Sequence, residues 1–263
     1  MQSSTPGDGR RSTGGERIYV GTPDGLLDCY LHTPGGTGRW PLVVVYMDAF
    51  GIRPALGRMA DRLASHGYAV VLPNLYYRHG EYPAFDPKAV APGGSEHQRF
   101  RGMIASINNA LVLQDTGRAL EALRSHAAVA PGPMAAVGYC MGGGFALSAA
   151  AAFSDRIVAA ASFHGGSLAT EKPDSPHLRA GEIQAALYVG VAGIDPTFDT
   201  AQRERLQAAL DDAGTAYTLE VYEGAKHGFA VDEHLAYDHD ASERHWVALT
   251  TLLREKLQAV AGI

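Results

Sequence analysis

The residue with the clearest chemical setting in this 263-residue sequence is Cys140, which lies in the segment Gly138-Tyr139-Cys140-Met141-Gly142. An apolar run precedes this segment and a small-residue helical stretch follows it, which is the setting of a nucleophile elbow with Cys in place of Ser. The glycines are needed because strand and helix approach closely at such a turn and the nucleophile has a strained backbone. A cysteine at a helix N-terminus is favoured as the thiolate, because unpaired N–H groups stabilise negative charge. The pattern predicts a thiolate nucleophile.

A packing role is the alternative interpretation of the same segment. Free cysteine is often a small buried hydrophobe, and glycines also occur where elements simply pack closely. A short motif carries a real risk of false matches, so the G-x-C-x-G pattern alone leaves both interpretations open. The second cysteine, Cys29, lies in the middle of the run LLDCYLH with no elbow around it, and we interpret it as structural.

A cysteine nucleophile needs a histidine base and a carboxylate that orients it, and both occur in the expected places. After such an elbow the acid follows a later strand and the histidine follows the last strand. His227 lies in YEGAKHGFA, directly after the β-like run at residues 216–224, and Asp195 lies in YVGVAGIDPTFD after the preceding run. The sequence therefore predicts a Cys140, Asp195 and His227 triad.

Other residues compete for the two supporting roles. The chain has eleven histidines, of which His164 is the strongest rival because FHGG ends a β-like run at the same predicted edge. We interpret His164 as part of the pocket floor. Asp199 and Asp232 are rival acids, and Asp195 is preferred because it is nearer to the end of its strand, where rigid elements position catalytic groups best.

Acyl transfer also requires donors for the oxyanion of the tetrahedral intermediate. The elbow supplies one donor, the backbone N–H of Met141. A second is expected from the loop after the apolar run PLVVVYM, where the prediction falls on the N–H of Ala49.

The elements that must position these groups follow from hydrophobic patterning. Short apolar runs alternate with helical-period segments, which indicates an α/β fold with helices on both faces of a sheet. Eight strands are predicted, over residues 16–22, 26–34, 41–47, 68–74, 134–140, 157–163, 185–193 and 216–224. The first two are joined by Pro-Asp-Gly and should form an antiparallel hairpin. The other six are apolar enough to be buried on both faces.

Helices are predicted between these strands. Pro54 begins one that ends before Gly67, the apolar residues from Phe100 to Leu111 mark a second, and a third ends before Gly214. A last helix is expected to begin near Asp240, with Glu243 completing a capping box. The long irregular connection at residues 76–98 is a predicted pocket wall, since long loops in compact domains are usually functional or mobile.

Composition restricts the class of protein. With 46% hydrophobic residues the chain can bury one large core, so we predict a flexible tail at residues 1–15 and one domain at residues 16–263. The formal net charge is −6 and no basic run occurs, so nucleic acid is not an expected partner. No metal or cofactor is expected, and the protein is expected to be a monomer or homodimer.

Location follows from what the sequence does not contain. The first fifteen residues have no apolar run of the kind that a secretory signal requires. The uncharged stretch at residues 134–153 is mostly Ala and Gly, which favours a buried strand and helix over a membrane span. Two distant cysteines form no disulfide framework and fit a reducing compartment. We expect a cytoplasmic protein with no membrane association.

From residue 16 onward the chain resembles the dienelactone hydrolase family. Three features carry the resemblance: GYCMGG with Cys140, the segment with Asp195, and EGAKHGF with His227. It implies an α/β-hydrolase fold with a mostly parallel sheet and no separate lid domain. It also implies that a carboxylate after the third strand contacts the resting cysteine. The matching residue is Asp48, where the family usually has Glu, and a bond from Asp48 to Arg53 or to the pocket backbone is the alternative.

The resemblance also implies residues that bind substrate. The family holds a substrate carboxylate with two arginines, of which Arg78 matches the first, whereas Val231 occupies the position of the second. The missing charge argues against dienelactone itself, although Arg78 could still bind an anion through its bidentate fork. The expected substrate-binding set is Asp48, Arg78, Phe50, Tyr139 and His164.

The expected activity is hydrolysis of a small ester or lactone through a Cys140 thioester. Two alternatives stay open on the sequence. The same triad could deliver the acyl group to another acceptor, as an acyltransferase or a lactone-forming cyclase. A non-catalytic receptor for a small acid or lactone is the other, and an intact triad argues against it.

Overall fold

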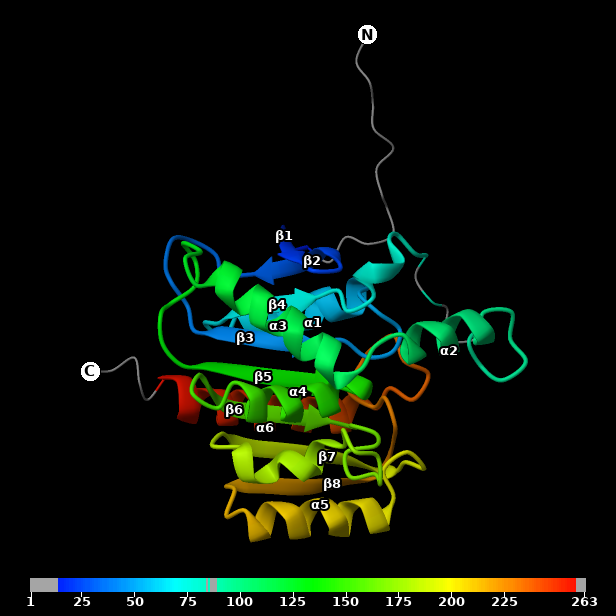
Figure 1. Ribbon diagram of the computed structural model, residues 1–263. Helices are drawn as coiled ribbons and strands as arrows, with labels where there is room; N and C mark the ends of the chain where they lie inside the picture. Colours follow the sequence, from blue (N-terminus) through cyan, green and yellow to red (C-terminus); the bar gives the residue numbers. More distant parts are fainter. Residues whose placement is uncertain (1–13, 84, 86–88, 259–263) are drawn as a thin grey trace.

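The computed structural model describes residues 14–83, 85 and 89–258, so most of the predicted N-terminal tail lies outside it. Within these residues one eight-stranded sheet has the strand order β1-β2-β4-β3-β5-β6-β7-β8 (Figure 1). β1 and β2 form an antiparallel hairpin, β2 pairs antiparallel with β4, and the remaining neighbours are parallel. The predicted mostly parallel α/β sheet is confirmed. The strands are Glu16–Thr22 (β1), Gly25–His32 (β2), Leu42–Tyr46 (β3), Ala69–Pro73 (β4), Met134–Tyr139 (β5), Ile157–Phe163 (β6), Ala186–Ile194 (β7) and Tyr217–Lys226 (β8).

The central strands consist almost entirely of small and β-branched apolar residues, because helices cover both of their faces. Every residue of β3 and β4 is buried. α3 and α4 lie in front of the sheet in Figure 1 and α6 lies behind it. α1 lies on the same side as α6, since Arg62 of α1 stacks on Trp246 of α6. The long helices are Pro54–Ala64 (α1), His97–Ala105 (α2), Asn109–Leu123 (α3), Met141–Ala152 (α4), Thr200–Asp212 (α5) and His239–Leu253 (α6).

Two helix boundaries differ from the sequence prediction. The apolar residues from Phe100 to Leu111 belong to two helices, because the Asn108 side chain accepts a hydrogen bond from Leu111 N and begins α3 as its N-cap. The last helix is capped by Asp238, which accepts from Ala241 N. Glu243 pairs with Arg62 and does not complete a capping box.

The short elements lie in the connections. They are the 3-10 helices Tyr77–His79 (η1) and Pro176–Glu182 (η2) and the π-helical turn Arg254–Gln258 (η3). Within the described part of the chain, no helix is long and apolar enough to cross a membrane.

The parallel strands place the site at one edge of the sheet. The carboxyl ends of β3, β5, β6, β7 and β8 meet at this edge, which is where open α/β sheets bind ligands. The residues that follow these strands are Ala49, Cys140, His164, Asp195 and His227. The three residues of the predicted triad, with His164 and Ala49, therefore reach one region.

Candidate active site

Cys140 occupies a strained turn between β5 and α4. Its backbone has φ 56° and ψ −123°, in the left-handed half of conformational space that side chains other than glycine rarely adopt. A Cβ at Gly138 would lie 1.9 Å from Gly142 O, and one at Gly142 would lie 2.5 Å from Tyr46 O. The two glycines of the motif are thus required by close backbone contacts that hold the elbow against β3.

His227 and Asp195 form the second part of the site. His227 Nδ1 lies 2.6 Å from Asp195 Oδ2, and the Asp195 side chain is only 1% exposed. The other carboxylate oxygen accepts hydrogen bonds from Thr197 N (2.8 Å) and Thr197 Oγ1 (2.6 Å). Asp195 therefore has a fixed orientation and holds one nitrogen of the imidazole.

Cys140 and His227 line the same cavity, and the Cys140 side chain is close enough to the imidazole to contribute to its pKa. Burial lowers the pKa of His227, but the hydrogen bond with Asp195 and the side chain of Cys140, together with the negative charges of both residues, outweigh it and raise this pKa to about 10. At neutral pH the proton therefore resides on the imidazole. A thiol beside such a base is disposed to react as the thiolate.

The two rival acids lie elsewhere. Asp199 is the N-cap of α5 and accepts a hydrogen bond from Gln202 N. Asp232 forms an ion pair with Arg58 of α1. Of the three acids weighed on the sequence, the structure brings Asp195 to the imidazole.

Replacing Asp195 with asparagine is expected to lower kcat for an activated aryl ester by roughly 10²- to 10⁴-fold, because an amide does not hold the protonated imidazole in the required orientation. Steady-state kinetics measure the effect. Asp199→Ala is the matched control: it removes the cap of α5, lowers the free energy of unfolding by about 1 kcal/mol and should leave kcat unchanged. An Asp195→Asn enzyme with wild-type kcat would contradict the assignment.

His164 lies beneath the elbow. Its side chain is buried, its Nδ1 lies 3.2 Å from Cys140 N, and its ring centroid is 5.3 Å from that of His227. Burial, and then the positive charge of His227, lower the pKa of His164 well below its ordinary value. A neutral ring that accepts the N–H of Cys140 supports the elbow from below. His164 is not among the described residues that line the cavity at Cys140, so its expected place in the pocket floor is corrected to a supporting one.

A cavity of about 620 Å³ opens above Cys140 and His227. Apolar lining residues come mainly from the C-terminal end of α2 and the start of α4, and polar ones come mainly from the loop after β6 and from Asn108 and Asn109. The lining includes Ala49, Ile104, Ala105, Ile107, Asn108, Asn109, Met141, Gly144, Phe145, Gly166, Ser167, Thr170, Lys172, Asp174, Ser175, Pro176 and Thr197. The volume suits a small organic substrate.

The two residues expected to supply oxyanion donors, Met141 and Ala49, both line this cavity. Met141 is the first residue of α4, and the first N–H groups of a helix have no acceptor within it. Ala49 also lines the cavity, and its carbonyl accepts a hydrogen bond of 2.9 Å from the Tyr76 hydroxyl. Whether the N–H groups of Met141 and Ala49 stabilise an oxyanion stays a prediction.

A sequence model described as the dienelactone hydrolase family matches residues 27–257, nearly the whole of the described chain. The chain belongs to this family. A carboxymethylenebutenolidase of Rhodococcus opacus is 27% identical over 201 residues, which cover 76% of this chain and 74% of that protein. The expected family, and with it a carboxylic ester hydrolase of the lactone and ester type, is confirmed.

Two solved structures have the same fold. A dienelactone hydrolase-like promiscuous phosphotriesterase from metagenomic libraries is 27% identical, with a TM-score of 0.72 over 92% of this chain and 99% of the other. A structure from Klebsiella pneumoniae is 20% identical, with a TM-score of 0.78 over 90% of this chain and 97% of that one. The second likeness shows the fold alone.

In this member of the dienelactone hydrolase family, Arg78 does not line the cavity. Its guanidinium forms a bidentate pair with the buried Asp115 of α3, at 2.7 and 2.9 Å, and also contacts Asp24. These contacts fasten η1 to α3. The expected role of Arg78 in holding a substrate anion is corrected to a structural one, because its hydrogen-bonding fork is already occupied.

The other four members of the expected substrate-binding set, His164 among them, also lie outside the described cavity lining. Asp48 is 2% exposed and both of its carboxylate oxygens bind Arg53, as the alternative interpretation foresaw. Phe50 packs on Phe100. Tyr139 is buried against Phe163, with its hydroxyl 3.2 Å from His245 Nε2. These side chains support the site from behind and do not face a substrate.

The sequence analysis missed two residues of the site. Thr197 holds Asp195 from two positions along the chain, and this Asp-x-Thr spacing is a known turn pattern that could have identified it. Lys172 lines the cavity from the loop after β6. It had no local signal, because nothing in that loop's sequence indicates that the loop folds back over the nucleophile.

Proposed function

We propose that this protein hydrolyses small carboxylic esters or lactones through a thioester on Cys140. The observation that carries the proposal is the position of His227, which hydrogen-bonds Asp195 and borders the same cavity as Cys140. The Cys140 side chain also contributes to raising the pKa of His227. Cys140 borders a cavity that is also lined by Met141 and Ala49, the two residues expected to supply oxyanion donors. Such an arrangement is suited to acyl transfer.

In the first half of the reaction the Cys140 thiolate attacks the carbonyl carbon and forms a C–S bond. The carbonyl oxygen becomes an oxyanion between the N–H groups of Met141 and Ala49. Collapse of this intermediate breaks the C–O bond, and the His227 imidazolium gives its proton to the departing alkoxide. The products are an alcohol, or the opened end of a lactone, and a thioester.

In the second half, neutral His227 removes a proton from water, which attacks the thioester. The sulfur of a thioester carries no negative charge, so one of the causes that raise the pKa of His227 is absent at this stage. The imidazole is then better suited to act as a general base. The C–S bond breaks, the acid is released, and the proton on His227 restores the initial pair.

Esters suit this site better than amides. From the tetrahedral intermediate a thiolate leaves more readily than an unprotonated amine, so an attacked amide tends to return to substrate. An alkoxide or enolate competes with the thiolate more effectively. The cavity contains one lysine, Lys172, and one aspartate, Asp174, within its described lining. We propose that Lys172, rather than Arg78, contacts a carboxylate on the substrate.

Lys172→Met is expected to raise KM for a carboxylate-bearing ester by about 3- to 10-fold, because an exposed ammonium contributes only modestly to anion binding. KM for a neutral ester of the same size should not change, and added salt should weaken only the first substrate. Arg78→Met is the comparison: it should lower thermal stability by leaving Asp115 unpaired, without altering the preference between the two esters. Equal KM values in wild type and Lys172→Met would exclude the contact.

The proposed function is tested by trapping the acyl-enzyme. After rapid mixing with an activated ester and acid quenching, mass spectrometry should show the acyl mass on the peptide that contains Cys140, with release of free acid at the steady-state rate. Acyl transfer to an added alcohol in preference to water would instead indicate an acyltransferase or cyclase. Binding of lactones without turnover would indicate a receptor.

A further inference from the structure

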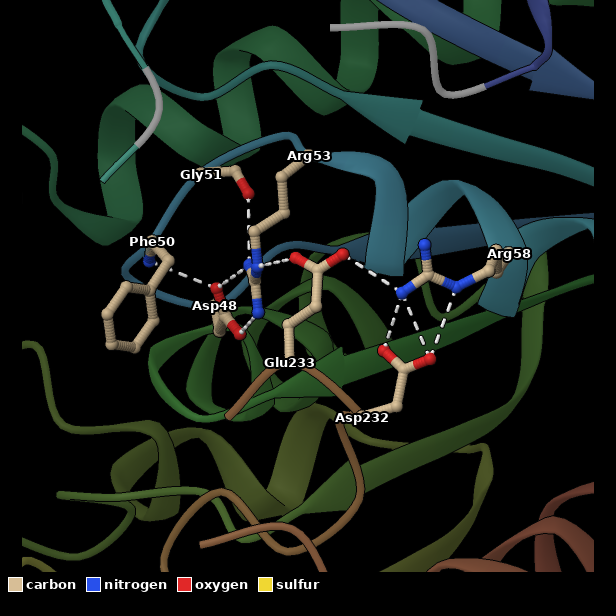
Figure 2. A network of polar contacts seen from close by, with 7 residues as sticks. All are labelled: Asp48, Phe50, Gly51, Arg53, Arg58, Asp232 and Glu233. Carbon is tan, nitrogen blue, oxygen red and sulfur yellow. Dashed lines mark hydrogen bonds and ion pairs between the residues drawn. The ribbon is translucent and has the colours of Figure 1, made fainter. Parts of the chain in front are cut away.

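Arg53 is a buried arginine that the reaction above does not use. It is 4% exposed and lies immediately before α1, at the end of the loop that follows β3. Its guanidinium binds both oxygens of Asp48, at 2.6 and 2.7 Å, and NH1 also donates to Gly51 O at 3.2 Å. Figure 2 shows these contacts converging on one side chain. Arg53, at the end of the loop that carries Ala49, therefore binds residues near the start of the same loop.

The same guanidinium also faces a second segment. Its Nε lies 3.4 Å from Glu233 Oε2, and Arg58, one turn into α1, binds both Asp232 and Glu233 (Figure 2). The two acidic residues lie shortly after His227 along the chain. The start of α1 therefore binds both the loop of Ala49 and the segment that continues from the catalytic histidine.

Arg53 is charged in this environment. Burial alone would lower its pKa, but Asp48, then Glu233 and the nearby Cys140, raise it. His234 is close enough to Arg53 to be affected by its charge. The pKa of His234 is lowered by burial and by the positive charges of His227 and Arg53. A planar guanidinium satisfies a buried carboxylate with two parallel hydrogen bonds, which a lysine cannot do. The two parallel hydrogen bonds fix both the orientation of the Asp48 carboxylate and its distance from the Arg53 guanidinium.

We propose that Arg53 is a positioning residue for the oxyanion site: it holds Asp48, and through it the N–H of Ala49, at a fixed distance from Cys140, using Glu233 as its second support. This inference rests on the proposed function, because it assigns Ala49 a role in acyl transfer. Displacements of about 1 Å in such a site reduce rates by about 100-fold.

The test compares ester acylation with alkylation of Cys140 by iodoacetamide. Acylation requires oxyanion donors, whereas alkylation requires only the thiolate and its histidine. Arg53→Lys keeps the charge and removes the fork, so kcat for an aryl ester should fall about 10- to 100-fold with KM within threefold of wild type. The second-order rate of alkylation, followed from pH 6 to 9, should stay within about twofold.

Two further variants support the test. Asp48→Asn combined with Arg53→Met removes both charges, so no buried charge is left unpaired; it should fold and show the same loss of kcat. Arg62→Lys is the control, because Arg62 lies on the same helix and forms a bidentate but exposed pair with Glu243. It should keep both rates.

The possible outcomes separate the two proposals. Wild-type kcat in folded Arg53→Lys and in the double variant would overturn the role of Arg53, and so would a parallel loss of acylation and alkylation, which indicates a general disruption. Failure of the proposed function would appear differently, as turnover that persists in Cys140→Ala. Thermal unfolding of each variant confirms that the compared proteins are folded.

Discussion

Replacing Cys140 with alanine is expected to lower kcat/KM for an activated aryl ester by at least ~10⁴-fold. The reason is that the covalent route disappears, while binding and oxyanion stabilisation alone leave only a small residual rate. The fold should be retained, because alanine is smaller than cysteine and the strained backbone is held by the glycines around it. Steady-state kinetics and the stoichiometry of labelling by iodoacetamide measure the effect.

Cys29→Ala is the matched control for this prediction. Cys29 is completely buried in β2, and burial raises the pKa of its thiol, so it should not be alkylated in the folded protein. Labelling should fall from one thiol to none in Cys140→Ala and remain at one in Cys29→Ala. Turnover in the Cys140 variant at the wild-type rate would remove the thioester mechanism.

Replacing His227 with alanine is expected to lower kcat by at least ~10³-fold and to slow alkylation of Cys140 near neutral pH. Without the imidazole, Cys140 loses the base that would accept its proton, so its reaction with an alkylating agent should slow. In the wild type the pKa of His227 is raised to about 10. Below that pH the imidazolium can pair with a thiolate, and alkylation should stay fast across the neutral range.

The same group links stability to pH. The pKa of His227 is higher in the folded protein than the value of about 6.5 expected when it is unfolded. Its contribution to stability is therefore complete below pH ~6.5 and is lost as the pH rises through about 10. The difference in free energy of unfolding between wild type and His227→Ala should shrink over that interval. Denaturant titrations that give a constant difference, or alkylation profiles that coincide, would contradict the assignment.

The sequence was sufficient to predict that Cys140, Asp195 and His227 meet at one edge of the sheet, because each follows a strand that hydrophobic patterning identifies. Parallel strands end at a common edge, so residues far apart in the chain were expected to meet there without any contact being known. Cys140 had the additional support of its glycines, whose purpose is visible in the backbone contacts at Gly138 and Gly142. At these positions the local sequence motif and the order of the strands predicted the same location.

Prediction failed where the answer depended on a distant partner. The position of Arg78 indicated an anion site, but Asp115 on α3 occupies its guanidinium, and no local pattern reveals that pairing. Asp48 had two possible partners, and the choice depends on how the Arg53 side chain folds back. The break between α2 and α3 was missed for a different reason: the apolar spacing continues through Asn108, and only its role as an N-cap separates the helices.

The helix α2 supplies one wall of the cavity, through Ile104 and Ala105 at its C-terminal end. In Figure 1 it extends beyond the layers of the sheet, and within its span only Met103 is fully buried. A helix with so little buried surface can move at a small cost in free energy. Substitutions at Ile104 and Ala105 are therefore expected to change which acyl groups fit the cavity while leaving Cys140 and His227 unaltered.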